Sequence, residues 1–247
     1  MPTFHSTTIA ARRNWDAGLF SLTLNTQVPF AAGQFLTLSR DPDGGRHRRR
    51  AYSVASKPDE PLEFLIVEVE GGAVSPLLSD LQPGDAIHVS DAGKGFFVPA
   101  DVPSAPDLWL MATGTGVAPY RAMLREASLF DRFERIILVY GARTKAQHAY
   151  AQEFDALAQA NAGRFQWIGL TSQEQATAST LHGRMTTRLI DGQLEARAKR
   201  PIDPRHSQVM LCGNPSMISE MLDGLERRGL SRNSRRHPGQ VTIEKYW

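Results

Sequence analysis

The chain has 247 residues, of which 41% are hydrophobic and 22% are charged, a balance typical of a globular protein with one large or two modest cores. Its single cysteine, Cys212, excludes an internal disulfide, a cysteine-ligated iron–sulfur cluster and a four-thiolate zinc site. No apolar run approaches the ~20 residues that cross a bilayer, and residues 1–10 lack the order of a signal peptide, so a cytosolic location is expected.

The first hundred residues contain short segments of alternating polarity, which predict β-strands. Such segments cover residues 19–24, 33–38 and 62–69, and turn-forming stretches at 41–45 and 57–61 separate them. Short strands at this spacing indicate an antiparallel β-barrel. We therefore predict a first domain with this fold over residues 1–100.

Three prolines between Val98 and Asp107 interrupt any regular element and indicate a linker. Beyond it, apolar segments with the length of strands alternate with segments of helical periodicity. Strands are predicted over 108–112, 135–140, 165–170 and 208–211, and helices over 118–130, 147–160, 185–191 and 215–228. Buried strands joined by crossover helices predict a parallel sheet with both faces covered, so the second domain, residues 101–247, is expected to be α/β. Ligands of such sheets bind beyond the carboxyl ends of the strands.

A glycine-rich turn, Ala112–Pro119, follows the first predicted strand of the second domain and opens a helix. Its glycines allow close approach of the backbone, and free amides at a helix N-terminus favour anionic groups, so the position suits a nucleotide. Tight packing alone is the less favoured alternative explanation of such a turn. Pro119 stands where the third glycine of the dinucleotide fingerprint would be, which disfavours an ordinary Rossmann dehydrogenase.

Arg50 and Tyr52 end a predicted barrel strand in the sequence Arg50-Ala51-Tyr52-Ser53. Alternation along a strand puts Arg50 and Tyr52 on the same face. A guanidinium beside a planar ring suits a flavin and its pyrophosphate, because the ring can stack and the arginine can bind phosphate with two hydrogen bonds. A solvated edge strand protected by arginines is the alternative explanation.

Five motifs occur in the order and at the separations of a known family. They are Arg50-x-Tyr52-Ser53; Gly71-Gly72-Ala73-Val74-Ser75-Pro76 with Leu81-Gln82-Pro83-Gly84-Asp85; Gly114-Thr115-Gly116-Val117-Ala118-Pro119; Cys212-Gly213-Asn214-Pro215; and Glu244-Lys245-Tyr246-Trp247. With them the chain resembles the ferredoxin (flavodoxin):NADP reductase family over nearly its whole length. The ending Val241 to Trp247 resembles the bacterial subclass with a C-terminal Tyr-Trp.

The resemblance implies an FAD site in the barrel domain. Arg50 would bind the pyrophosphate, Tyr52 would stack on the isoalloxazine ring, and Ser53 would lie near flavin N5. Tyr246 would cover the other flavin face, so that the nicotinamide must displace it, and Trp247 would stack on the adenine. The remaining implied FAD contacts are Ala51, Ile66, Ala73, Val74, Ser75 and Thr115.

The resemblance also implies roles for Cys212 and Glu244 beside the nicotinamide and flavin N5, where they would hold geometry and pass protons. With Ser53 and Tyr246 they make up the implied catalytic set. Without the resemblance, a small buried hydrophobic residue is the favoured explanation of Cys212, and an exposed C-terminal charge is the alternative explanation of Glu244.

Preference for NADP(H) over NAD(H) requires cations at the 2′-phosphate, which accepts paired hydrogen bonds from guanidinium groups. The resemblance assigns this role to Arg143 and Arg184. A third family position, often arginine, is Gln173 here, which weakens the preference without reversing it. The other implied NADP(H) contacts are Thr113, Gly114, Thr144 and Ser172.

The segment from Arg227 to Arg236 is densely basic, and the formal net charge of +2 has its positive excess in the second half of the chain. Such a segment suits an acidic carrier protein, and given the resemblance a ferredoxin or flavodoxin is expected; an ordinary solvated helix end is the alternative. No aromatic residues interleave these arginines, which argues against single-stranded nucleic acid. We expect a monomer with neither a nucleic-acid nor a membrane partner.

The sequence therefore predicts a ferredoxin (flavodoxin):NADP+ reductase, a flavoprotein that contains FAD and no metal. It would transfer hydride between NADP(H) and FAD, and single electrons between FAD and the carrier. Two alternatives stay open: the reductase component of an oxygenase or a free-flavin reductase, and a nucleotide-binding redox sensor without turnover.

Overall fold

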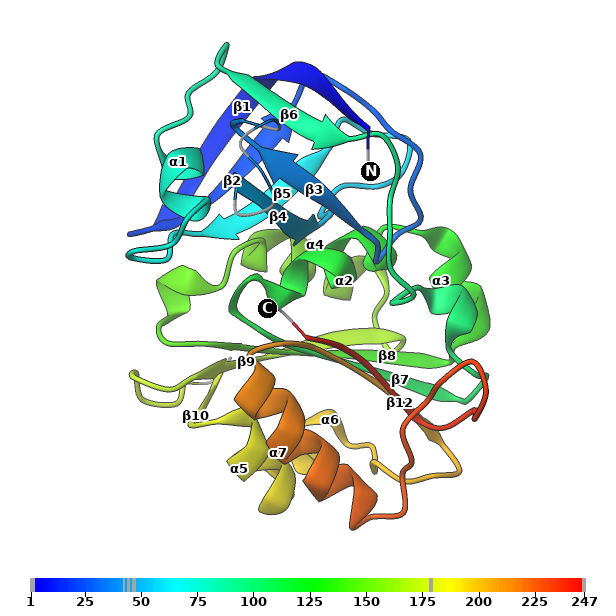
Figure 1. Cartoon of the computed structure of the whole chain (residues 1–247). Helices are drawn as coiled ribbons and strands as arrows, with labels where there is room; N and C mark the ends of the chain where they lie inside the picture. Colours follow the sequence, from blue (N-terminus) through cyan, green and yellow to red (C-terminus); the bar gives the residue numbers. More distant parts are fainter. Residues whose placement is uncertain (1–2, 42, 44, 46–47, 178–179, 246–247) are drawn as a thin grey trace. The chain divides into compact units, whose positions relative to one another are not determined.

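A computed structural model describes residues 3–41, 43, 45, 48–177 and 180–245 of the chain. The chain divides into two compact units (Figure 1). Met1–Pro99 and Ala118–Glu126 form the first unit, and Ala100–Val117 with Ala127–Trp247 form the second. The short segment 118–126 thus groups with the N-terminal unit.

The first unit is a six-stranded antiparallel sheet in the order β4-β3-β6-β1-β2-β5. Its strands are β1 (Phe4–Asp16), β2 (Leu19–Leu24), β3 (Phe35–Ser39), β4 (Arg49–Ser53), β5 (Glu63–Val67) and β6 (Ala86–Ser90). The two outer strands meet, because Val54, just after β4, pairs with Phe64 of β5, and the Ala55 N–H donates to the Glu63 carbonyl at 2.8 Å. This closure confirms the predicted antiparallel barrel. Buried apolar side chains from β1, β2, β3, β5 and β6 fill its interior.

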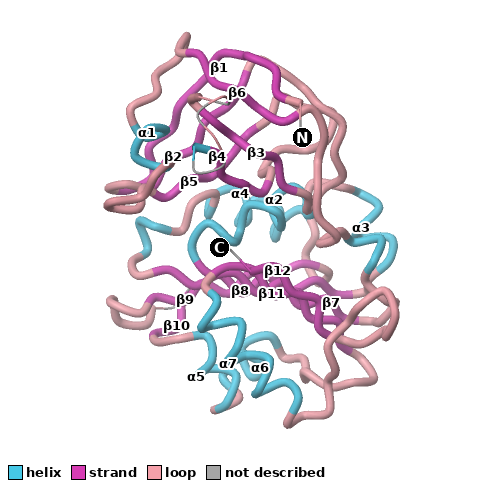
Figure 2. Tube along the Cα trace, viewed as in Figure 1, coloured by secondary structure: helices cyan, strands magenta, loops and turns pink. Residues whose placement is uncertain are grey.

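The second unit contains a six-stranded parallel sheet in the order β10-β9-β8-β7-β11-β12 (Figure 2). Its strands are β7 (Asp107–Thr113), β8 (Arg135–Ala142), β9 (Phe165–Thr171), β10 (Thr180–His182), β11 (Ser207–Gly213) and β12 (Val241–Lys245). The chain builds outward from β7 to β10 and then returns to the other side of β7 with β11 and β12. The switch point of the topology therefore lies between β7 and β11, where α/β sheets bind ligands.

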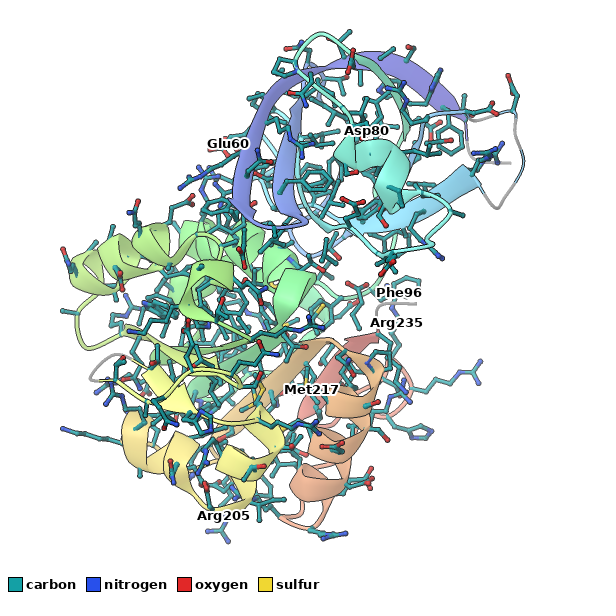
Figure 3. All side chains as sticks on the ribbon, turned by 90° about the vertical axis from the view of Figure 1, so that its left-hand side faces the viewer. Glu60, Asp80, Phe96, Arg205, Met217 and Arg235 are labelled. Atoms are coloured by element: carbon teal, nitrogen blue, oxygen red, sulfur yellow. The ribbon has the colours of Figure 1, made fainter. Side chains whose placement is uncertain are left out.

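Helices cover both faces of this sheet (Figure 1). Those of the second unit are α3 (Ala127–Arg132), α4 (Ala151–Ala160), α5 (Met185–Ile190), α6 (Gln193–Ala198) and α7 (Pro215–Glu226). Helices α5, α6 and α7 pack on one face, where Met217, labelled in Figure 3, joins Val139 in a common apolar core. On the opposite face, Phe154 of α4 contacts the rings of Tyr140 and Trp167. These two covered faces confirm the predicted α/β architecture.

The helix predicted over 118–130 is wrong as one element, because the chain breaks it into α2 (Ala118–Leu124) and α3. All seven residues of α2 are buried. Arg121 donates to the Ala55 carbonyl at 3.0 Å and to the Glu63 carboxylate at 2.8 Å, and Arg125 binds both carboxylate oxygens of Glu60. These contacts bind α2 to the barrel unit, so the following residues leave the helical path.

A short helix, α1 (Ser75–Ser79), follows β5 in the first unit. In the part of the chain that the structure describes, no helix is both long and apolar enough to cross a membrane. The cytosolic location stays a prediction.

Candidate active site

The end of β4 presents the predicted flavin-stacking residues on the barrel. Arg50 and Ala51 are exposed, Tyr52 is half-buried against the barrel core, and Ser53 is buried. Burial raises the pKa of Tyr52 to about 12, and the charge of Arg50 partly opposes this shift. The guanidinium therefore lies near the phenol, as expected for two residues on one face of a strand. The ring stays a neutral hydrogen-bond donor at neutral pH.

The turn before α1 is built by contacts within the turn. The Ser75 hydroxyl accepts a hydrogen bond from the Val69 N–H at 3.0 Å, and the Gly72 N–H donates to the Val69 carbonyl at 2.9 Å. A Cβ at Gly72 would lie 2.8 Å from that carbonyl, so only glycine fits. Ala73 is exposed and Val74 is buried, and the backbone contact of this turn with FAD stays a prediction.

Ile66 differs from the other predicted FAD contacts, because its side chain is fully buried within the barrel core. Only its backbone on β5 is left to face a ligand. The predicted role of Ile66 is thereby restricted to backbone contact.

Two loops meet at the switch point of the parallel sheet. The Thr113 hydroxyl, at the end of β7, accepts a hydrogen bond from the Asn214 N–H, just after β11, at 3.0 Å. A Cβ at Gly116 would lie 2.5 Å from the Cys212 carbonyl oxygen, and one at Gly213 would overlap Thr113, so both glycines are required by close approach of the loops. The glycine-rich turn thus packs tightly and also leaves Gly114 exposed at the carboxyl edge.

Cys212 and Glu244 are direct neighbours across two parallel strands. Cys212 of β11 pairs with Glu244 of β12 on one side and with Ala112 of β7 on the other. Paired residues of parallel strands project to the same face of a sheet, so the thiol and the carboxylate lie side by side. Cys212 is fully buried and Glu244 half-buried, which fits a positioning and proton-holding pair better than an exposed nucleophile.

The loops after β8, β9 and β10 lie at the same carboxyl edge and carry the other predicted NADP(H) contacts. Ala142, Thr171 and His182 are aligned across the three strands. Arg143, Ser172 and Arg184 follow them and are all exposed. Thr115 of the β7 loop is half-buried.

Thr144 is distinctive within this group, since its hydroxyl oxygen is buried and has no hydrogen-bond partner among the described residues. It caps a short 3-10 turn, Lys145–Gln147, without using its side chain. The predicted contact of Thr144 with NADP(H) stays a prediction.

Two residues of this edge, Glu174 and His182, were not predicted. The Glu174 carboxylate accepts the Lys145 N–H at 2.7 Å, and the Glu174 carbonyl accepts the Nδ1–H of His182 at 2.6 Å. The first contact joins residues 29 positions apart and the second joins residues eight positions apart, and neither pair forms a recognisable motif in the sequence.

Tyr246 and Trp247, the predicted flavin-covering and adenine-stacking residues, lie outside the described residues. The structure describes β12 up to Lys245. Their roles stay predictions.

The basic segment from Arg227 to Arg236 connects α7 to β12 and therefore lies at the amino edge of the parallel sheet, opposite the loops described above. Its arginine side chains are not all exposed and free of ion pairs, as the sequence alone would suggest. Arg228 is half-buried and binds the Glu195 carboxylate at 2.6 Å, whereas exposed Arg235 (Figure 3) lies 3.4 Å from the Asp101 carboxylate.

The residues present fit FAD and NADP(H) on two separate observations. In the first unit, exposed Arg50 has no ion pair within the described ranges and lies beside the half-buried ring of Tyr52. In the second, Arg143 and Arg184 are both exposed and follow β8 and β10 at the carboxyl edge of the sheet. A ring with a guanidinium suits a flavin nucleotide, and guanidinium groups suit a phosphorylated ribose.

Comparisons with known proteins agree with this division. The oxidoreductase FAD-binding domain matches residues 8–96, and the oxidoreductase NAD-binding domain matches residues 110–222. Fold and site therefore define the class as an oxidoreductase with one FAD-binding and one nicotinamide-nucleotide-binding domain.

Individual relatives narrow this class. A flavodoxin/ferredoxin–NADP reductase of Escherichia coli is 40% identical over 238 residues, covering 95% of each chain. A ferredoxin NADP+ reductase from Neisseria gonorrhoeae, solved with bound FAD and NADP, superposes over the whole of both chains with a TM-score of 0.91 at 26% identity. The chain belongs to the flavodoxin/ferredoxin–NADP reductase family. It is a flavoprotein oxidoreductase that works with FAD and NADP(H).

A cytochrome P450 reductase from Amycolatopsis shares the fold, with a TM-score of 0.76 at 24% identity. This chain covers 71% of that longer protein. The likeness shows that a cytochrome P450 reductase shares this fold, so the fold alone does not identify the electron acceptor.

Proposed function

We propose that the chain transfers hydride between NADP(H) and FAD and exchanges single electrons with ferredoxin or flavodoxin as its carrier. The observation that supports this most directly is the lateral pair of Cys212 and Glu244 at the carboxyl end of β11 and β12, next to the glycine-rich turn after β7. When bound, FAD supplies the two-electron chemistry toward the nicotinamide and the one-electron chemistry toward the carrier.

The proposed roles of the barrel residues follow from their exposure and protonation. Arg50 would bind the FAD pyrophosphate through its exposed guanidinium, and Tyr52, neutral because its pKa is about 12, would stack on the ring as an uncharged phenol. Ser53 would lie near flavin N5, and the backbone of Ala73 to Ser75 would contact the FAD phosphates.

In the parallel-sheet unit, Cys212 and Glu244 would hold the nicotinamide in position and exclude water from the reacting atoms. Glu244 would also hold or release a proton next to flavin N5. The exposed guanidinium groups of Arg143 and Arg184 would bind the 2′-phosphate, with Thr144 next to Arg143 in the same loop.

We further propose that the chain belongs to the subclass with a C-terminal Tyr-Trp. Tyr246 would cover the flavin face that the nicotinamide must reach, and Trp247 would stack on the adenine. The support is the sequence of the last residues, together with their position after β12, which ends next to β11 at the carboxyl edge.

A visible absorption spectrum of the purified protein, recorded before and after addition of NADPH or NADH, tests the proposal. We expect flavin bands equivalent to about one FAD per chain, which bleach preferentially with NADPH. A colourless protein that rejects added FAD would contradict the assignment. Stopped-flow reduction of a purified ferredoxin and a purified flavodoxin then identifies the carrier.

The alternative of a redox sensor is separated by turnover. Steady-state reduction of ferricyanide by NADPH should proceed through many cycles if the chain is an enzyme, whereas a sensor would stop after about one NADPH is oxidised, and two ferricyanide ions are reduced, per FAD.

A further inference from the structure

The three loops that carry Arg143, Ser172 and Arg184 are joined to one another by hydrogen bonds, and most of these bonds involve the stretch Thr171 to Glu174. The Gln173 N–H donates to the Arg143 carbonyl at 2.9 Å, which fixes the β9 loop to the β8 loop. The Gly183 N–H donates to the Thr171 carbonyl at 2.8 Å, which fixes the residue before Arg184 to β9.

Glu174 contacts both neighbouring loops at once. Its carboxylate accepts the Lys145 N–H at 2.7 Å and so caps the 3-10 turn that begins directly after Thr144. Its carbonyl accepts hydrogen bonds from the Thr171 hydroxyl at 3.1 Å and from the His182 ring at 2.6 Å. Glu174 thus contacts the β8 loop through its side chain and the end of β10 through its backbone carbonyl.

The carboxylate of Glu174 caps the first N–H of this 3-10 turn, that of Lys145, whereas Thr144 makes no side-chain cap. The Thr144 hydroxyl oxygen is buried and has no hydrogen-bond partner among the described residues.

On the Arg184 side, a second residue fixes the same loop. Arg188 of α5 donates through Nε to the His182 carbonyl at 2.7 Å and forms an ion pair with Asp191. Gly183 has a φ of +110°, and a Cβ there would lie 3.0 Å from the Arg188 guanidinium, so glycine is favoured directly before Arg184. His182 is thereby held through its ring by Glu174 and through its carbonyl by Arg188.

We propose that Glu174 is a positioning residue for NADP(H) specificity: through its carboxylate and its carbonyl it holds the loops of Arg143 and Arg184 at the spacing that a ribose 2′-phosphate requires. This inference rests on the proposed function, in which those two arginines bind the phosphate. Glu174 itself does not contact the phosphate, because its carboxylate is engaged by the Lys145 N–H and its negative charge would repel a dianion.

The hydrogen bond and the charge of Glu174 make opposite predictions, so a pair of variants separates them. Glu174→Gln keeps an oxygen that can accept the Lys145 N–H but removes the charge, whereas Glu174→Ala removes both. Glu226→Ala, an exposed residue at the end of α7 on the opposite edge of the sheet, is the matched control for charge and for substitution to alanine.

The test measures binding of adenosine 2′,5′-bisphosphate and of adenosine 5′-monophosphate to the full-length, FAD-loaded protein by titration calorimetry. We expect Glu174→Ala to weaken the bisphosphate about 5- to 20-fold and the monophosphate less than twofold, since misplaced loops forfeit one charge-assisted contact. Glu174→Gln and Glu226→Ala should stay within about twofold of wild type for both ligands. The same ratio should appear in KM for NADPH against NADH, with kcat little changed.

Three results would overturn the inference. Tighter binding of the bisphosphate by Glu174→Ala would mean that the carboxylate only repels the phosphate. Equal weakening of both ligands would indicate a general structural role. Weakening by Glu174→Gln as large as by Glu174→Ala would remove the hydrogen bond as the cause.

Arg143→Ala and Arg184→Ala distinguish failure of this inference from failure of the proposed function. If both arginine variants lose 10-fold or more for the bisphosphate while Glu174→Ala loses nothing, the phosphate site stands and only the positioning role fails. If neither arginine variant changes the preference for the bisphosphate, the proposed NADP(H) site itself is wrong.

Discussion

At the scale of single residues, Asp107 carries a charge that the fold compensates poorly. It begins β7 with 1% of its surface exposed, and neither carboxylate oxygen has a hydrogen-bond partner among the described residues. The Arg200 Nε lies 3.9 Å from one of them. Burial raises the pKa of Asp107 above its ordinary value of 3.8, and Arg200 opposes that shift only in part.

Replacing this carboxylate should therefore stabilise the protein at neutral pH. Because the folded-state pKa of Asp107 is the higher one, its favourable contribution is complete below pH 3.8 and is lost as pH rises through the folded-state pKa. We expect Asp107→Asn to raise the free energy of unfolding by about 1 kcal/mol at pH 7, and by less at pH 4.5. Urea unfolding followed by tryptophan fluorescence measures this, with the exposed Asp131→Asn as control. A loss of stability at pH 7 would mean that the pair with Arg200 is net favourable.

His148 titrates in the opposite sense. It is 5% exposed, lies edge-on to the rings of Tyr140 and Trp167, and donates through Nε2 to the Tyr140 carbonyl at 3.0 Å. Burial lowers the pKa of His148 below its ordinary value of 6.5, against the raising effect of its hydrogen bonds to backbone carbonyls and of Glu174.

Since the unfolded state binds this proton first, the stability that neutral His148 contributes is complete above pH 6.5 and is lost as pH falls below it. One such group gives a slope of at most about 1.4 kcal/mol per pH unit. We expect His148→Gln, whose amide can also donate, to flatten this slope between pH 6.5 and 5.5. Unfolding midpoints in urea at three pH values provide the measurement, and exposed His237→Gln should leave the slope unchanged.

At the scale of elements, the hydrophobic pattern of the sequence predicted the long buried strands, but not the breaks that contacts with distant residues cause. The predicted strands 108–112, 135–140, 165–170 and 208–211 correspond to β7, β8, β9 and β11, because these are continuous buried apolar runs. Strand β10 has three residues, too few for a periodic signal. The break between α2 and α3 was missed because its cause, the contacts of Arg121 and Arg125 with residues some sixty positions earlier, is not local.

The candidate site residues also divide into those that sequence motifs predict and those that only the structure reveals. Motifs identified Arg50, Cys212 and Glu244, and the structure brings the last two together on adjacent strands. Glu174 could not be identified from the sequence, because its role depends on which loops the strand order places side by side.

The two arginines of α2 should differ in their contribution to stability. Arg121 is buried and its partner Glu63 nearly so, with side chains 9% and 18% exposed, whereas Arg125 and Glu60 are each 35% exposed. Removing one member of a buried pair leaves an uncompensated charge, at a cost of about 3 kcal/mol, whereas a surface pair contributes about 0.5 kcal/mol. We therefore expect Arg121→Ala to destabilise the barrel unit strongly and Arg125→Ala only slightly. In a double-mutant cycle, Arg121→Ala with Glu63→Ala should recover part of the loss, and additive losses would contradict the pairing argument.

At the scale of the whole molecule, the basic segment from Arg227 to Arg236 and the loops after β8, β9 and β10 lie at opposite edges of one parallel sheet. Those loops carry the predicted NADP(H) contacts. Helix α7 has 12 residues and runs from one edge to the other, a length of about 18 Å. Carrier and nucleotide can therefore be recognised by separate surfaces of the second unit, if the basic segment is the docking surface for the carrier.

This separation predicts how charge reversal should act. Arg232 and Arg236 are exposed and have no ion pair among the described residues, unlike Arg228, which Glu195 neutralises. The double variant Arg232→Glu, Arg236→Glu should raise KM for ferredoxin or flavodoxin about 3- to 10-fold at low ionic strength, because long-range attraction of an acidic carrier is lost. KM for NADPH and the rate of ferricyanide reduction should stay within about twofold, since neither depends on that edge.

Raising the salt concentration should abolish the difference between variant and wild type, because exposed charges are screened beyond ~10 Å at 0.1 M. Steady-state assays with carrier and with ferricyanide, at two ionic strengths, provide the measurement. Equal losses with both acceptors would assign the segment to the stability of the second unit, and no loss with either would move the carrier to another surface.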